Sequence, residues 1–160
     1  DCTSPLWFLR NLLDLRVKNV LTHFMIIRIL KSKRGYKMDS EILYKKVLDC
    51  CFEVHKALGP GLLESAYKKA LVIELQDKNI KVDVEKEMPI VYKGREIQCG
   101  YRADLIVEDL IIIELKAVLN MNEIYTSQIL TYMKLSNIRL GLLINFNVKL
   151  LKEGIYRRII

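Results

Sequence analysis

Histidine and paired cysteines are scarce in this chain of 160 residues. There are only two histidines, His23 and His55, and the four cysteines form no Cys-X-X-Cys pair. Zinc sites and disulfide frameworks need regularly spaced cysteine and histidine, so the sequence favours neither. Reduced thiols in a cytoplasmic protein are the simpler interpretation, with Cys50 and Cys51 as core residues rather than a redox pair.

Long apolar runs are also missing, although 51% of the residues are hydrophobic. No run reaches the roughly 18 residues of a membrane-spanning helix. No clean apolar run is followed by the small-residue cleavage site of a secretory signal. Because 28% of the residues are charged, the composition is that of a folded chain. We expect one domain with its own core, and no membrane contact for residues 38–160.

The basic excess of the chain is confined to its beginning. The formal net charge is +7, but residues 1–37 contain eight of the 26 Lys and Arg residues and two of the 19 Asp and Glu residues, a net charge of +6. Residues 38–160 contain the other 18 basic and 17 acidic residues, a net charge of +1. Bulk charge is therefore no argument that this part binds nucleic acid.

Residues 1–37 also differ in pattern from the rest. They mix aromatic and aliphatic residues with scattered Arg and Lys, and they end in a basic stretch over residues 31–37. The sequence becomes regular from Met38 onwards. We favour an N-terminal extension outside the domain, with Met38 as the natural start and residues 38–160 as the domain. The alternative is an amphipathic helix for a membrane surface or a partner.

The regular part contains helical and then strand periodicity. Asp39-Ser40 and the apolar spacing that follows predict a helix from Ser40 to Leu58, where Gly59-Pro60-Gly61 ends it. Turns are expected at Lys93-Gly94 and at Glu108-Asp109. Further helices are predicted over 62–77 and 120–136, and strands over 81–92, 96–107, 110–118, 139–146 and 156–160. The order α-α-β-β-β-α-β-β indicates an α/β protein of α+β character.

Two charged residues interrupt the most apolar of these strands. Glu114 and Lys116 are two residues apart, so on a strand they face the same side, directly after Ile111–Ile113. A tight turn at Glu108-Asp109 brings Asp104 opposite the neighbourhood of Glu114, and opposed residues on one face of a sheet have Cβ atoms about 5 Å apart. Two such carboxylates suit Mg²⁺, and a metal-bound water is a nucleophile for phosphodiesters.

The interpretation of this charged pair leaves alternatives open. Lys116 could hold or deprotonate the attacking water, or neutralise charge that develops on the phosphate. A plain structural ion pair between Glu114 and Lys116 is the simpler alternative, but the apolar surroundings weaken it, because buried charges are costly unless they are paired or bind a metal.

Two helices supply further candidates. Glu64 and Tyr67 share one face of the second helix, and Gln128 and Tyr132 share one face of the third. By themselves, Glu64 is explained by the helix N-terminus, and the Gln128 pair by the polar flank of an amphipathic helix. His55 is more typical of a packing residue than of a general base.

Five motifs occur in one order: Gly61-X-X-Glu64-X-X-Tyr67, Tyr101-Arg-Ala-Asp104, Glu114-Leu-Lys116, Gln128-X-X-X-Tyr132, and the segment Gly141–Phe146. Together they resemble the GxxExxY protein family of the PD-(D/E)XK nuclease superfamily, over residues from about 40 to 160. The resemblance implies a restriction-endonuclease-like core, which is a mixed β-sheet of four to five strands flanked by helices. It also implies Asp104, Glu114 and Glu64 as metal ligands, Lys116 as the catalytic lysine, and Gln128 and Tyr132 as an exonuclease-type element.

The leading functional hypothesis is therefore a cytoplasmic nuclease that uses Mg²⁺ or Mn²⁺ and acts on DNA ahead of RNA. The alternative is a non-catalytic module that keeps the fold and binds nucleic acid or protein. The near-neutral charge of residues 38–160 favours this alternative. A homo-oligomer is left open. Candidate contacts to nucleic acid are Lys68, Lys69, Arg95, Arg102, Lys134 and Arg139.

Overall fold

The computed structural model describes residues 39–98 and 100–160. The predictions made for residues 1–37 and for a start at Met38 lie outside these residues. In the part of the chain that the structure describes, no helix is both long and apolar enough to cross a membrane.

Three α-helices flank the sheet: α3 (Ser40–Leu58), α4 (Glu64–Asp77) and α5 (Glu123–Ser136). Their ends follow local chemistry. The Asp39 side chain accepts a hydrogen bond from the amide of Glu41 at 2.8 Å, and the Asn122 side chain accepts one from Ile124 at 3.0 Å, as N-caps do. Gly59 ends α3 with a φ of 65°, a conformation that glycine adopts at little cost.

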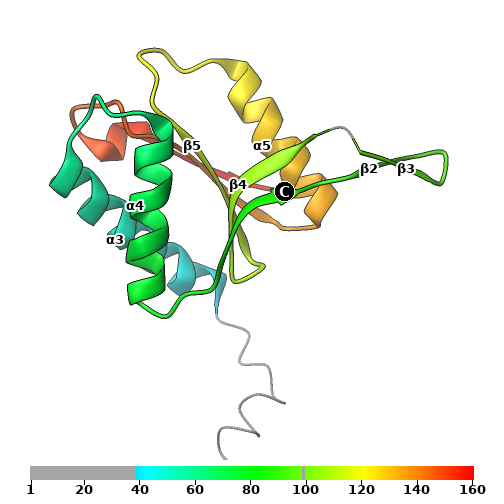
Figure 1. Cartoon of the computed structure of the whole chain (residues 1–160), viewed down its shortest axis with the longest axis horizontal. Coiled ribbons are helices and arrows are strands. Elements are labelled where there is room, and N and C mark those ends of the chain that lie inside the picture. Colours follow the sequence, from blue (N-terminus) through cyan, green and yellow to red (C-terminus); the bar gives the residue numbers. More distant parts are fainter. Residues whose placement is uncertain (1–38, 99) are drawn as a thin grey trace, which may run out of the picture. The chain divides into compact units, whose positions relative to one another are not determined.

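The main sheet has five strands in the order β1-β4-β5-β6-β7. Only β5 and β6 run parallel, and the other neighbours are antiparallel. The strands are β1 (Val82–Glu87), β4 (Arg102–Val107), β5 (Ile111–Lys116), β6 (Leu140–Asn145) and β7 (Ile155–Ile159). The helices α3 and α4 lie on one side of this sheet and α5 on the other (Figure 1). The predicted class, a mixed sheet flanked by helices, is confirmed.

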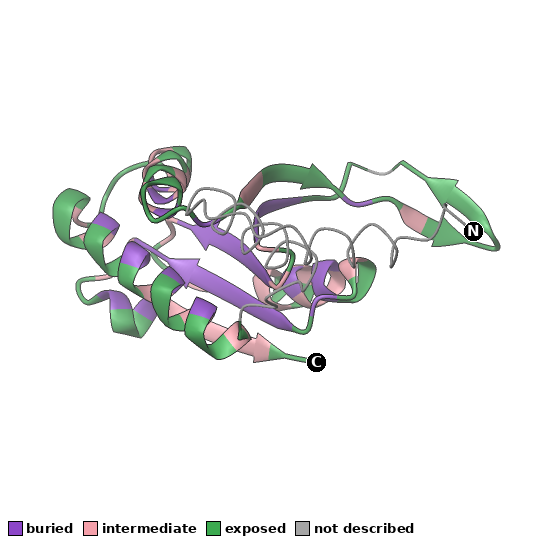
Figure 2. Ribbon diagram, turned by 90° about the horizontal axis from the view of Figure 1, so that it is seen from below, coloured by how far each residue is buried: buried purple, intermediate pink, exposed green. Residues whose placement is uncertain are grey.

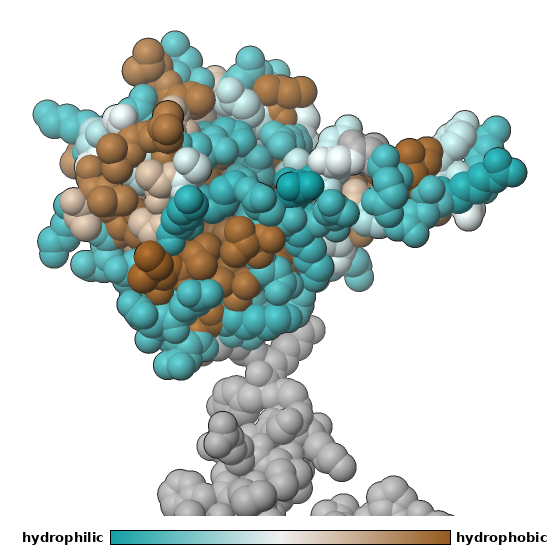
Figure 3. Space-filling model, viewed as in Figure 1, coloured by the Kyte–Doolittle hydropathy of each residue, from teal (hydrophilic) through white to brown (hydrophobic). Residues whose placement is uncertain are grey.

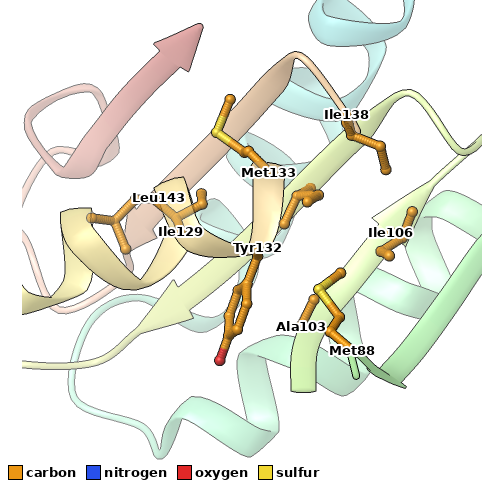
Figure 4. Close-up of a cluster of buried hydrophobic side chains, with 9 residues drawn as sticks. Met88, Ala103, Ile106, Ile129, Tyr132, Met133, Ile138 and Leu143 are labelled. Carbon is orange, nitrogen blue, oxygen red and sulfur yellow. The ribbon is translucent and has the colours of Figure 1, made fainter. Parts of the chain in front are cut away.

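The central strands β5 and β6 are buried along their whole length, whereas β7 at the edge is only partly covered (Figure 2). On the α5 side, buried side chains form one apolar cluster (Figure 4). Its members are Met88, Ala103, Ile106, Ile112, Ile129, Tyr132, Met133, Ile138 and Leu143. This cluster fixes α5 against the sheet, and with it the side chains that α5 directs toward the end of β5.

Two predicted strands are each divided in the structure. The strand expected over 81–92 becomes β1 and β2 (Ile90–Tyr92), and the one expected over 96–107 becomes β3 (Arg95–Ile97) and β4. Pro89 has no amide hydrogen for a ladder bond, and Gly100 has a φ of 71°, so both strands bend near the same level. The predicted Lys93-Gly94 turn does join β2 and β3.

As a result, β2 and β3 form a separate two-stranded sheet that projects from the body, with hydrophilic surface over much of it (Figure 3). A short 3-10 helix, η1 (Leu151–Gly154), was not predicted.

Candidate active site

The candidate site begins where the pairing of two strands ends. The ladder between β4 and β5 runs from Val107 and Ile111 to Leu105 and Ile113. Beyond that point the Asp104 side chain replaces a backbone partner, because its Oδ2 accepts a hydrogen bond from the amide of Leu115 at 2.9 Å in a buried position. Continued by one residue, the register places Asp104 opposite Glu114, within the neighbourhood that the predicted hairpin indicated.

Glu114 is almost completely buried, with 3% of its surface exposed. Its Oε1 accepts a hydrogen bond from Lys116 Nζ at 2.8 Å, while its Oε2 is buried without a hydrogen-bond partner. Burial, and then the charge of Asp104, raise the pKa of Glu114 to about 7, although the hydrogen bond from Lys116 opposes the shift. A buried carboxylate oxygen that lacks a partner is costly, which is typical of a site built to bind something.

Lys116 is the second buried charge on β5. Burial alone would lower its pKa, but the hydrogen bond and the charge of Glu114 outweigh burial, so the pKa is raised. Its ammonium also lies 5.2 Å from the ring centroid of Tyr125 on α5 and 4.0 Å from Glu64 Oε2. The side chain is therefore held as a cation between β5, α4 and α5.

Glu64 is the first residue of α4 and is partly exposed. Burial raises its pKa, the charge of Lys116 opposes this shift, and the charge of Asp104 adds to it. Four predicted residues, Glu64, Asp104, Glu114 and Lys116, thus lie close enough to influence one another. Their catalytic and metal-binding roles stay predictions.

Sequence reasoning missed one direct partner of this group. Lys68 donates a hydrogen bond to Asp104 Oδ1 at 2.8 Å and another to Glu85 Oε1 at 3.0 Å. From the sequence, we expected Lys68 only as a candidate contact to nucleic acid. The available signal was its spacing, since Lys68 follows Glu64 by four residues and residues so spaced share a helix face.

Gln128 and Tyr132 both lie on α5, and their side chains form a hydrogen bond with each other. The Gln128 amide donates to the Tyr132 hydroxyl at 2.7 Å. The Tyr132 ring belongs to the apolar cluster, where Figure 4 shows it extending from α5 toward Ala103, and it contacts Tyr101 edge-on with a centroid distance of 6.2 Å. The proposed reach of this pair toward a metal-bound water stays a prediction.

Tyr67 and His55 hold loops in the structure. The Tyr67 hydroxyl donates to the carbonyl of Gly59 at 2.7 Å and accepts from the amide of Leu62 at 3.0 Å, while its ring stacks on Phe146. These bonds fix the loop that leads to Glu64. His55 Nε2 lies 2.9 Å from the carbonyl oxygen of Val148, at hydrogen-bond distance, which supports the packing interpretation of His55.

Asn145 was not singled out from the sequence. Its side chain accepts hydrogen bonds from the amides of Val118 and Asn147 and donates one to the carbonyl of Val118. It thereby ties the segment after Lys116 to the end of β6.

The superfamily is decided by a comparison with family models. The model described as the PD-(D/E)XK nuclease superfamily matches residues 41–159. The chain belongs to the PD-(D/E)XK nuclease superfamily. The match runs from the second residue of α3 to the last residue of β7, and it includes Glu114, Leu115 and Lys116. Searches of curated proteins and of solved structures found no match.

PD-(D/E)XK nucleases generally use divalent metals, so the fit of these residues to such an ion matters. Within residues 39–98 and 100–160, no group of three or more His, Cys, Asp or Glu side chains is arranged to hold a metal. Mg²⁺, however, is commonly bound through one or two carboxylates and keeps several waters. The unpartnered Oε2 of Glu114, next to the charge of Asp104, meets that smaller requirement.

Proposed function

We propose that this chain is a divalent-metal-dependent nuclease that hydrolyses phosphodiester bonds of DNA ahead of RNA, with Mg²⁺ or Mn²⁺. Within the superfamily we assign it to the GxxExxY branch. The observation that carries the proposal is the buried, unpartnered Glu114 Oε2, which lies on an apolar strand beside a second carboxylate and a lysine. A buried ion pair is favourable only when further hydrogen bonds satisfy its remaining lone pairs, and Glu114 Oε2 has no such bond.

Asp104 and Glu114 would hold the metal, with Glu64 completing the site from α4. A divalent ion bound there would stabilise negative charge on the phosphate and lower the pKa of a bound water. A bound cation would favour the charged form of Glu114, whose pKa is raised by burial and by the charge of Asp104.

Lys116 acts in this proposal as a fixed positive charge. Because its pKa is raised, it keeps its proton at neutral pH and is a poor base. Of the roles left open by the sequence, stabilisation of the phosphate charge fits best. Glu114 and the Tyr125 ring hold the ammonium in place, so no reorganisation is needed when the substrate arrives. Gln128, held by Tyr132, is the proposed helper that orients water or phosphate.

A basic groove supports a nucleic-acid substrate despite the low net charge. It has a volume of about 500 Å³ between the end of α3 and the segment after β6, and its rim carries Lys56, Lys149 and Lys152. Since β5 and β6 are parallel and Lys116 is paired with Asn145, the groove begins at the same end of the sheet as the site. Glu53 lines the groove as well, so phosphates that pass the site would meet a formal charge of +2 on this side.

The groove is tested by fluorescence anisotropy with a labelled oligonucleotide at several salt concentrations. Changing Lys56, Lys149 and Lys152 to serine should weaken binding and reduce the salt slope by up to about 3. The matched control changes the exposed lysines Lys45, Lys46 and Lys78 to serine, none of which is a candidate contact to nucleic acid. Equal salt slopes of binding for the two triple variants would exclude the groove as a contact to nucleic acid.

Cleavage assays test the function itself. The full chain is incubated with linear, nicked and single-stranded DNA and with RNA, in Mg²⁺, in Mn²⁺ and in chelator. We expect metal-dependent cleavage that is lost in Glu114→Gln and Lys116→Met. Cleavage that survives both substitutions, or that persists in chelator, would contradict the site assignment.

The second candidate is a binding module without catalysis. It is favoured by the net charge of +1 over residues 38–160 and by the full pairing of Lys68 and Lys116 with carboxylates. It predicts nucleic-acid binding without cleavage of any substrate and without heat of metal binding in calorimetry. Light scattering during size-exclusion chromatography tests separately whether the chain forms the homo-oligomer that the sequence leaves open.

A further inference from the structure

Lys68 lies between two carboxylates at the edge of the candidate site. Its ammonium is 2.8 Å from Asp104 Oδ1 and 3.0 Å from Glu85 Oε1. The Lys68 and Asp104 side chains are largely buried, with 15% and 12% of their surfaces exposed, whereas Glu85 is about half exposed. Lys68 therefore has one inner and one outer anionic partner.

Asp104 has little capacity left for a further cation while Lys68 is bound. Its Oδ2 already accepts the buried hydrogen bond from Leu115, and its Oδ1 accepts the one from Lys68. A divalent ion on either oxygen would lie within about 5 Å of the ammonium, where two positive charges repel each other strongly because the site is partly buried. The ion and Lys68 thus oppose each other on Asp104.

Glu85 shows that the outer position is built into the fold. The β1–β4 ladder pairs Val84 with Leu105 and Lys86 with Ala103, but it skips the pair between them, Glu85 and Asp104. Glu85 has a φ of 50°, a left-handed conformation that is unfavourable for a residue with a Cβ atom. Strained residues of this kind concentrate at functional positions. The strain falls on the residue that faces Asp104 across the strands and contacts Lys68.

We propose that Lys68 is a positioning residue that competes with the divalent ion for Asp104 and moves to Glu85 alone when the ion binds. Lys68 thereby sets the metal concentration at which the site becomes occupied. It also keeps a positive charge next to the place where the phosphate would bind. This inference rests on the proposed metal-dependent function. It assigns Lys68 and Glu85 a role that neither the site motifs nor the superfamily match contains.

Isothermal titration calorimetry with Mn²⁺ on the full chain tests the proposal without measuring cleavage. Lys68→Met should bind Mn²⁺ at least fivefold more tightly than wild type, because the competing charge is gone. Lys69→Met is the matched control, since Lys69 is the exposed neighbour on the same helix, and it should bind as wild type does.

Glu85→Gln gives the opposite sign. Without its outer partner, Lys68 would have to give up its only ion pair, so Mn²⁺ should bind about two- to fivefold more weakly. This variant alone decides the matter if Lys68→Met does not fold, as judged by circular dichroism. In the Lys68→Met background, Glu85→Gln should have almost no further effect.

The failures are distinguishable. Equal or weaker Mn²⁺ binding by a folded Lys68→Met, or wild-type affinity in Glu85→Gln, overturns the role of Lys68 and leaves the metal site standing. No Mn²⁺ binding by wild type and by Lys68→Met overturns the proposed metal-dependent function and this inference with it.

Discussion

The two halves of β5 are equally buried but are built in opposite ways. Ile111–Ile113 are apolar and pair with strands on both sides. Glu114–Lys116 keep the pairing with β6, while the ladder with β4 has already ended. The same strand thus passes from a sealed core into a place where side chains take over from backbone partners. The site therefore depends on the early end of pairing between β4 and β5, which leaves room for the Asp104 side chain.

The first half should control stability alone. Ile112 is fully buried in the apolar cluster, so Ile112→Ala should lower the free energy of unfolding by about 2–5 kcal/mol. Cleavage per folded molecule should stay unchanged. Urea denaturation measures the loss, with Ile42→Ala as the exposed control, expected within about 0.5 kcal/mol of wild type. A loss below 1 kcal/mol for Ile112→Ala would show that the cluster can repack.

The second half should control chemistry. Lys116→Met should reduce the cleavage rate by about 10²–10³-fold, the usual cost of removing a preorganised charge that stabilises a transition state. Single-turnover cleavage with saturating enzyme measures this effect, and Lys45→Met, an exposed lysine on α3, serves as control. A variant that keeps more than a tenth of the wild-type rate would assign Lys116 to structure.

The two halves of β5 should also differ in how they make stability depend on pH. The pKa of Glu114 is raised to about 7, so the folded chain binds this proton more tightly than the unfolded chain. In chelator, wild type should therefore lose stability as the pH rises from about 4.5 to about 7. Between pH 4.5 and 8, Glu114→Gln should gain roughly 3 kcal/mol relative to wild type.

Urea denaturation at a series of pH values measures this difference. The Ile112→Ala curve should run parallel to the wild-type curve, because that variant keeps Glu114. Parallel curves for wild type and Glu114→Gln would mean that Glu114 titrates normally.

The smallest effects are expected at the Gln128–Tyr132 pair. Tyr132→Phe removes one hydrogen bond and should cost about 1 kcal/mol of stability, with a cleavage loss of only a few-fold. Gln128→Leu should reduce cleavage about tenfold, or about 1.4 kcal/mol in the barrier. If both variants cleave as wild type does, the pair merely holds α5 on the cluster.

Much of the fold could be predicted because local signals agreed with the tertiary structure. The Asp39 cap and the Gly59 stop gave the bounds of α3, and the turn at Glu108-Asp109 gave the hairpin that brings Asp104 into the neighbourhood of Glu114. The division of two strands near Pro89 and Gly100 was missed, because alternation continues through both bends. A proline and a glycine at matching levels of a hairpin are the signal that was available.

The candidate site was predictable in part for the same reason. Asp104, Glu114 and Lys116 stood out because charge on an apolar strand is anomalous, whatever the tertiary structure. Lys68 did not stand out, because a lysine on a helix is ordinary until the fold places it against a buried carboxylate. Tyr125 was missed likewise, since its contact with Lys116 joins residues on different elements.

The hydrogen bond from Leu115 to Asp104 has a consequence for experiment. Amides in a paired strand exchange with solvent only when the sheet opens, whereas the Leu115 amide is protected by a single side chain. Its exchange rate should therefore follow the orientation of Asp104 rather than the opening of the sheet. The amide proton of Leu115 on β5 therefore reports what Asp104 binds. Hydrogen–deuterium exchange measures it without a covalently attached probe.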